Sequence, residues 1–305
     1  MSKEIEIPEH LRRLMAEIGP RWATNVPGHV MQTVKAFSEV LARCPKEGVT
    51  IKRDLPYGQH KRQVLDVYSP KRSENSSSNA PVVVFVHGGA FTDGEKDRSP
   101  EVYGNVCLWF ARNGIVGINM EYRAAPEAQY PAGTQDVKLA CQWIEKNAAS
   151  LGVDMQKLFV FGHSAGAAHS AAYAYGAPGS EGGPKVAGSI VVSGRVRADN
   201  LPTNPNARKV EAYYGTDASL FEERSALYLA GKDSVPTFIA IAEYENPLLD
   251  VYCLELAHRL GMAKGRSPRL MQLWGHNHSS IIAHINTSED ALGKALVEFV
   301  HNPVK

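Results

Sequence analysis

A short segment around Ser164 has the residue types and spacing of a serine nucleophile. It reads GHSAG at 162–166, follows the apolar run 157–161 and precedes the small-residue run AAHSAAYAYG, which predicts a strand before it and a helix after it. Such a tight turn needs glycine or small residues beside the serine, because larger side chains would collide. Ser164 would then project its hydroxyl from the turn, with the amide of Ala165 facing the oxygen of an attacked carbonyl.

A second glycine-containing segment, HGGAF at 87–91, directly follows the most apolar run of the chain, at 82–86. Two adjacent glycines at a strand end, Gly88 and Gly89, let the backbone approach a bound molecule and turn its N–H groups toward a negative oxygen. Together with Ala165 they predict an oxyanion hole. His87 is expected to support this loop, since the general base must come from further along the chain.

The elements that must position these segments are read from apolar patterning. Short apolar runs at 82–86, 115–120, 157–161, 190–193, 237–242 and 270–274 are typical of strands covered on both faces. Longer segments between them predict helices, and repeated strand and helix units predict an α/β fold with a mainly parallel central sheet and helices on both faces.

Capping residues and apolar spacing set the expected positions of three of these helices. One begins at Ser99 as N-cap, with Pro100 in its first turn, and stops at Asn113-Gly114. Another is expected at about 134–147, where Cys141 has the spacing of a core residue. The last helix is expected to be capped by Thr287 or Ser288.

Two regions of the chain lie outside this alternation of strands and helices. Residues 1–48 have apolar positions at helical spacing interrupted by prolines, which predicts an N-terminal helical segment that contributes to a cap on a catalytic domain at 49–305. Residues 195–235 exceed the length of a simple crossover and predict a cap or lid. Four of their aromatic side chains either line a substrate site or pack the cap itself: Tyr213, Tyr214, Phe221 and Tyr228.

The combination of HGGAF, EYRAAPEAQYPAGTQDV at 121–137 and GHSAG resembles the α/β-hydrolase superfamily, and within it the hormone-sensitive-lipase-like carboxylesterases and the kynurenine formamidases. The likeness covers about 80–300, with HGGA where these families usually have HGGG, and YRAAPE where they have YRLAPE. The resemblance implies an α/β-hydrolase fold and a triad in the chain order serine, acid, histidine, with the acid after the seventh core strand and the histidine after the eighth.

The acid must then follow the run 237–242, where Glu243, Glu245 and Asp250 compete. Alignment on the family's Pro-Leu-x-Asp pattern would place Asn246 at the catalytic position, but asparagine lacks the charge that stabilises an imidazolium. Glu245 is therefore the expected acid, because its extra methylene can offset a shifted backbone, and Asp250, expected within the next helix, is the reserve.

The histidine must follow the run 270–274, where His276 and His278 both qualify. His278 is favoured because it resembles the formamidase arrangement, in which the functional histidine immediately precedes a helix. His276 is the reserve, and hydrogen bonding around the site is its alternative role. The remaining histidines, including His163 beside the serine, are expected to be packed or exposed without a catalytic task.

Composition narrows the class of partner. The chain has 33 Lys and Arg and 32 Asp and Glu, for a net charge of +1. This charge gives no electrostatic attraction that would hold a nucleic acid or an anionic membrane. No apolar run is long enough for a membrane span, and the start MSKEIEIPEH lacks a secretory signal, so a cytoplasmic location is expected. Four dispersed cysteines predict buried, reduced thiols. The chemistry requires no metal or organic cofactor, and whether the protein forms a homo-oligomer is left open.

These features favour a serine hydrolase that cleaves small carboxylic esters through an acyl-enzyme on Ser164. An aryl amide or formamide hydrolase, similar to an arylformamidase, is the nearest alternative with the same residues. Two readings come from other classes: a non-catalytic ligand receptor, which predicts a damaged triad, and a lyase, which would use the triad as a base without a covalent intermediate.

Overall fold

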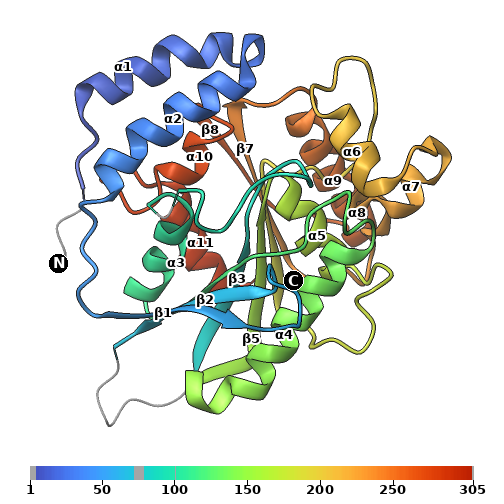
Figure 1. The fold of residues 1–305 in the computed structure, drawn as a ribbon, viewed down its shortest axis with the longest axis horizontal. Helices are drawn as coiled ribbons and strands as arrows, with labels where there is room; N and C mark the ends of the chain where they lie inside the picture. The colour runs from blue at the N-terminus through green and yellow to red at the C-terminus, as the bar shows by residue number, and fades with distance from the viewer. Residues whose placement is uncertain (1–4, 72–78, 100, 304–305) are drawn as a thin grey trace.

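The computed structural model describes residues 5–71, 79–99 and 101–303, and it has one sheet with helices on both sides (Figure 1). The sheet has eight strands in the order β1-β2-β4-β3-β5-β6-β7-β8. Strand β2 is antiparallel to β1 and β4, and every other neighbouring pair is parallel. The strands are β1 (Val49–Pro56), β2 (Val64–Pro70), β3 (Ala80–Val86), β4 (Val116–Met120), β5 (Val153–His163), β6 (Gly188–Val192), β7 (Thr237–Tyr244) and β8 (Arg269–Asn277).

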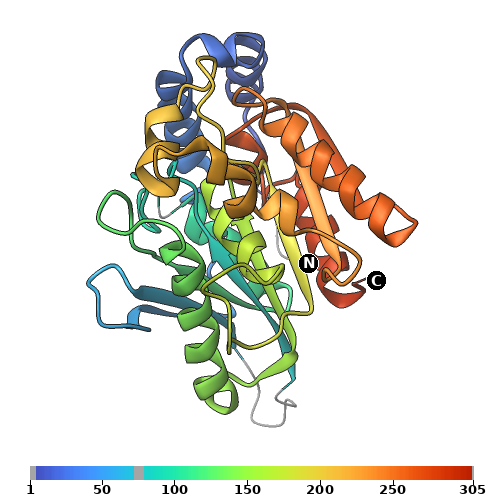
Figure 2. The same cartoon turned by 90° about the vertical axis from the view of Figure 1, so that its right-hand side faces the viewer.

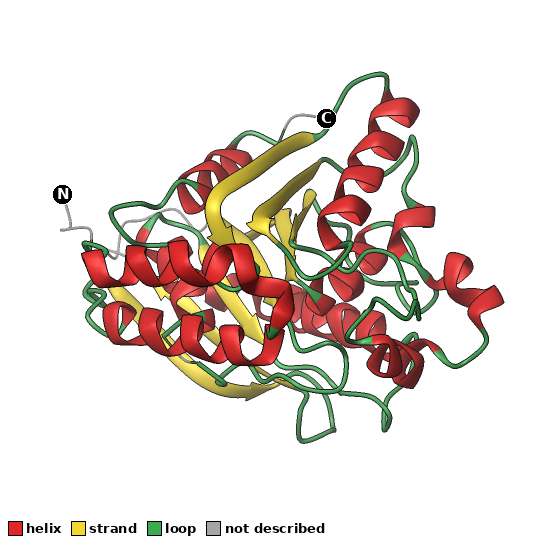
Figure 3. Cartoon of the chain, turned by 90° about the horizontal axis from the view of Figure 1, so that it is seen from above, coloured by secondary structure: helices red, strands yellow, loops and turns green. Residues whose placement is uncertain are grey.

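The longer helices alternate with the parallel strands, as the sequence pattern predicts, and cover both faces of the sheet when it is viewed from above (Figure 3). They are α3 (Tyr103–Arg112), α4 (Ala132–Leu151), α5 (Ala165–Ala174), α9 (Leu249–Lys264) and α11 (Leu292–His301), with the short α10 (Ser280–Ala283) after β8. The expected α/β fold with a mainly parallel sheet is confirmed.

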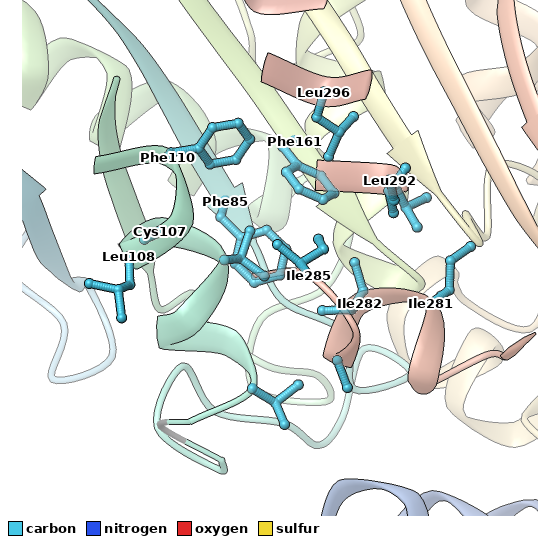
Figure 4. Close-up of a cluster of buried hydrophobic side chains, with 14 of the residues drawn as sticks. Phe85, Cys107, Leu108, Phe110, Phe161, Ile281, Ile282, Ile285, Leu292 and Leu296 are labelled. Atoms are coloured by element: carbon cyan, nitrogen blue, oxygen red, sulfur yellow. The ribbon is translucent and has the colours of Figure 1, made fainter. Parts of the chain in front are cut away.

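Alternate residues of the central strands feed two separate cores, as the two-residue period of a strand requires. On one face Phe85 and Phe161 pack with α3, α10 and α11 (Figure 4). On the other face Val84 and Val160 pack against α4, where Cys141 is fully buried as expected. All four cysteines are free and buried.

Two helix starts differ from the sequence expectation. Helix α3 begins at Tyr103, although the Ser99 hydroxyl does accept a bond from the Val102 amide; Pro100 lies outside the described residues. Helix α11 begins at Leu292, and neither Thr287 nor Ser288 caps it. Asp290 accepts from the Gly293 amide at 2.5 Å instead, because the chain runs on irregularly after α10 before it turns into the helix.

The N-terminal region is helical, with α1 (Glu9–Ile18), the 3-10 helix η1 (Gly19–Thr24) and α2 (Val26–Leu41). Pro20 and Pro27 each fall in the first turn of an element, where a missing N–H is tolerated. Residues 195–235 contain α6 (Ala207–Tyr214), η2 (Ala218–Leu220), α7 (Phe221–Arg224) and α8 (Ala226–Leu229). Both regions lie at the same end of the sheet (Figure 2). Within the described residues, no helix is long and apolar enough to cross a bilayer.

Three buried histidines make the stability of this fold depend on pH. Burial lowers the pKa of His163, His169 and His284 to about 3, because the charged imidazolium is disfavoured inside the protein. In the unfolded chain the same groups titrate near 6.5. As pH falls below that value, the unfolded chain binds protons that the folded chain does not, and stability is lost.

We predict that the free energy of unfolding falls between pH 7 and pH 5 by about 2 kcal/mol for each of these histidines. Urea unfolding at the two pH values measures the fall. In His284→Gln the fall should be smaller by about the same 2 kcal/mol. The control His258→Gln, at an exposed position of α9, should keep the wild-type pH dependence. Identical pH dependence in all three proteins would contradict the assignment.

Candidate active site

Ser164 occupies the turn between β5 and α5 in a backbone conformation that few residues adopt, with φ 55° and ψ −121°. The packing around the turn imposes this conformation. A Cβ at Gly162 would lie 2.3 Å from the Ala167 Cα, and one at Gly166 would lie 2.1 Å from the Val86 carbonyl oxygen. Only glycine fits at these two positions, and the helix start therefore comes close to β3.

His278 joins Ser164 to Glu245 through both nitrogens of its ring. Its Nε2 lies 3.0 Å from the Ser164 Oγ, and its Nδ1 lies 2.6 Å from the Glu245 Oε2. Since the carboxylate can only accept, Nδ1 carries the proton and Nε2 accepts from the serine hydroxyl. The imidazole is 5% exposed. The structure thus brings the three favoured residues into one hydrogen-bonded chain.

Glu245 is held by two further donors at its other oxygen. The Ala242 amide donates to Oε1 at 2.8 Å, and the Ser193 hydroxyl donates to the same atom. Ser193 follows β6, the neighbour of β7, and the sequence analysis assigned it no role. Its signal was its place, since a polar residue at the carboxyl end of a buried parallel strand faces the edge where ligands bind.

The reserve residues lie elsewhere. Asp250 lies in the first turn of α9, and Glu243, the third carboxylate considered, accepts from the Gly275 amide on β8. His276 Nδ1 lies 3.2 Å from the Ser280 Oγ, and its ring packs 4.2 Å from that of His284. Within the described part of the chain, none of the three has a hydrogen bond to Ser164 or His278.

Asn246 has a structural partner rather than a place in the triad. Its Oδ1 accepts from the indole N–H of Trp22 at 2.9 Å, and both side chains are buried. Tyr244, two residues before Asn246, packs so closely on η1 that a Cβ at Gly19 would lie 2.5 Å from its ring. The loop that carries Glu245 is thereby attached to the N-terminal helices.

Of the two expected oxyanion glycines, Gly88 lies next to the serine, and Gly89 packs against the loop that follows it. A Cβ at Gly88 would be 3.0 Å from the Ser164 Cβ, and one at Gly89 would be 1.8 Å from the Asp93 carbonyl oxygen. Gly89 has φ 153°, which also favours glycine. Burial raises the pKa of Tyr103, and a hydrogen bond from the Gly88 amide to its phenol oxygen partly offsets that effect.

A buried network supports this loop, and it explains the EYR sequence at 121–123. Glu121 accepts from His87 Nε2 at 3.0 Å and from the Lys96 amide at 2.8 Å. The Tyr122 hydroxyl donates to the His87 carbonyl, and its ring lies 4.4 Å from the imidazole. Arg123 pairs with the fully buried Asp136 at the start of α4. His87 thus occupies the supporting position expected of it.

His163, which the sequence analysis left without a task, packs against His278. Its Nε2 lies 2.9 Å from the His278 carbonyl oxygen, and the ring centroids are 4.9 Å apart. Because burial lowers its pKa to about 3, the ring is neutral and Nε2 carries the donated proton. His163 therefore fixes the backbone at His278.

Three of the four aromatic residues singled out in 195–235 pack the cap. Tyr213 stacks on Phe91 of the HGGAF segment, with centroids 4.9 Å apart and planes inclined by 5°. Tyr213, Tyr214 and Phe221 are each buried to within 5% exposure. They form one apolar cluster with Ala165 at the start of α5. Packing is therefore the role observed for these three, whereas Tyr228 lies beneath the guanidinium groups of Arg197 and Arg259.

Comparison with known proteins relates this arrangement to esterases. The BD-FAE family model matches residues 65–180. The esterase LipC of Mycobacterium tuberculosis is 36% identical over 115 residues, covering 38% of this chain and 27% of that protein. The carboxylesterase NlhH of the same species is 41% identical over 93 residues, covering 29% and 27%. The chain therefore spans about a quarter of the length of these curated relatives.

A solved structure shares the fold over almost the whole chain. The hyperthermophilic esterase from the archaeon Pyrobaculum calidifontis superposes with a TM-score of 0.69 at 22% sequence identity, and the match covers 97% of each chain. With a fold shared over nearly its whole length, this chain has the α/β-hydrolase fold, and the matched family model spans both of its glycine motifs.

Proposed function

We propose that the protein is a serine carboxylesterase that cleaves small carboxylic esters through an acyl-enzyme on Ser164. The observation that carries the proposal is the hydrogen-bonded chain from Ser164 through His278 to Glu245, set on the strained turn before α5. The esterase names of the relatives support cleavage of esters, and no observation favours the aryl amide or formamide alternative.

In the first step, Ser164 Oγ attacks the ester carbonyl carbon while His278 Nε2 takes the serine proton. The carbonyl oxygen becomes negative and is stabilised by backbone amides. We assign this role to Gly88, Gly89 and Ala165. The C–O bond then breaks, and His278 returns the proton to the leaving alcohol.

In the second step, water attacks the acyl-enzyme as His278 removes its proton, and Ser164 leaves with the proton restored. The imidazolium that forms in each step is stabilised by the Glu245 carboxylate. Glutamate serves here because Ser193 and the Ala242 amide hold Oε1, which leaves Oε2 directed at His278. Ser193 is a positioning residue for the acid.

We also propose a role for the two regions outside the sheet, the N-terminal helices and residues 195–235. Residues 195–235 act as a cap that is anchored by the stack of Tyr213 on Phe91, and the N-terminal helices, from α1 to α2, complete the cover over the site. A cytoplasmic location belongs to the proposal as well, supported by the four free, buried cysteines.

We predict that a fluorophosphonate probe adds once to the wild-type protein, on Ser164, as intact mass and peptide mapping would show. Ser164→Ala should give no adduct and should lower turnover of 4-nitrophenyl butyrate by about 10⁴-fold or more. His278→Ala should lose the adduct too. Thermal denaturation should be unchanged in Ser164→Ala, since one hydroxyl is removed at a turn.

The matched control is Ser150→Ala, at an exposed serine near the end of α4, which should label and turn over like the wild type. An active Ser164→Ala protein would disprove the acyl-enzyme. Turnover without a covalent intermediate would favour the lyase class.

A second prediction concerns the support of the acid. Ser193→Ala removes one hydrogen bond to the Glu245 carboxylate, and such bonds to charged groups contribute about 1.5–3 kcal/mol. Since the Ala242 amide still holds Oε1, we expect the lower end of that range, which is about a tenfold drop in the rate of probe labelling. Ser189→Ala, on the strand β6 that precedes Ser193, is the control and should label normally. Equal rates in the two variants would remove Ser193 from the mechanism.

A further inference from the structure

A cavity of about 490 Å³ opens between the N-terminal helices and the start of α3, a volume within the usual range of small-molecule pockets. One wall is α2, with Val30, Met31 and Val34 facing the space. Val102 and Ile282 supply apolar surface opposite. Helix α2 crosses above α3 and α10 in Figure 1, and it contacts α10 directly.

The inner end of this cavity adjoins the proposed catalytic residues. His163 and Ser279 line it, and they are the chain neighbours of Ser164 and His278. Tyr103 also lines it, and its phenol oxygen faces the Gly88 amide. The cavity therefore borders residues adjacent in the chain to Ser164 and His278, and a chain attached to a carbonyl at Ser164 is expected to extend into it.

The charged groups of the lining are all cations. Lys35 on α2 and Arg98 before α3 both line the cavity, and the lining contains no carboxylate. Across the described ranges neither cation has an ion-pair partner; the nearby Asp93 is bound to Lys209. Tyr103 and His163 add no charge at neutral pH, because burial raises the pKa of the phenol and lowers that of the imidazole.

We propose that this cavity selects esters in which an apolar chain ends in a carboxylate, such as the half-esters of aliphatic dicarboxylic acids. The apolar walls take the methylene chain, and Lys35 and Arg98 attract the terminal carboxylate at the mouth. The inference rests on the proposed function, since it assumes an ester held at Ser164, and it assigns the substrate class of that same site.

The expected size of the effect follows from the exposure of the two cations. Both side chains are solvent-exposed, and exposed ion pairs contribute about 0.2–1 kcal/mol each, or up to about fivefold in an equilibrium or rate constant. Such contributions are screened by salt, because the Debye length shortens to a few ångströms as the ionic strength rises. The selection is therefore expected to be modest for each cation, additive for the pair and sensitive to salt.

The test compares esters that differ only in the terminal carboxylate. Monoethyl adipate and ethyl hexanoate place the acid on the acyl side, and 6-acetoxyhexanoate and hexyl acetate place it on the alcohol side. For each pair the ratio of kcat/KM for the acidic to the neutral ester is measured in the wild type, Lys35→Gln, Arg98→Gln and the double variant. Lys146→Gln, at an exposed position on α4 outside the cavity, is the charge-matched control.

We expect the ratio for one of the two pairs to fall about two- to fivefold in each single variant and about tenfold in the double variant, with no change in Lys146→Gln. Raising NaCl from about 0.05 M to about 0.5 M should move the wild-type ratio toward that of the double variant. Ratios for both pairs that stay constant across all variants would overturn the proposal while leaving the esterase intact.

Binding separates this proposal from the proposed function. Calorimetric titration of the Ser164→Ala protein with the same esters reports on the cavity without turnover. Binding of the acidic ester that weakens several-fold in Lys35→Gln/Arg98→Gln, relative to the neutral ester, supports the cavity assignment even if the wild type hydrolyses neither pair. Equal weakening of the acidic and neutral esters overturns it.

Discussion

The backbone at Ser164 is the constraint on which the site depends. The residue holds a positive φ between β5 and α5 because glycines at 162 and 166 let the helix approach β3 without a side chain in between. The strain is therefore maintained by the sheet and not by the turn itself. The same close approach places Gly88, at the end of β3, against the serine, so the nucleophile and the expected oxyanion amides are positioned by one contact.

The proposed acid and base are positioned by a second set of contacts that runs through the N-terminal helices. The Ser193 hydroxyl and the Ala242 amide hold Oε1 of Glu245. The side chain of the next residue, Asn246, accepts a hydrogen bond from the indole of Trp22 in η1. His278 is fixed by Glu245 at its ring and by His163 at its carbonyl. The helices before the sheet therefore stabilise the triad as well as forming one wall of the cavity.

The two covering segments have different roles. In residues 195–235 the side chains of Tyr213, Tyr214 and Phe221 pack in one cluster with Phe91 and the start of α5. This packing holds the segment over the HGGAF loop. In α2 the residues that face α3 leave a cavity, and its mouth has Lys35 and Arg98. We therefore propose that substrate is selected at α2 and not by the aromatic residues of 195–235.

The sequence by itself determined the α/β fold and singled out Ser164, because continuous apolar runs and a glycine-flanked turn are local signals. Glu245 and His278 were expected from the order of triad residues that the resemblance implies. The sequence missed the cap of α11 at Asp290, since an irregular segment after α10 delays the helix. It left Glu245 competing with Asp250, and it gave no role to Ser193, His163 or Trp22. Only the tertiary structure shows the partners of Ser193, His163 and Trp22, because each of them bonds to a residue on another strand or helix. Such contacts depend on how the carboxyl ends of the parallel strands meet at one edge of the sheet.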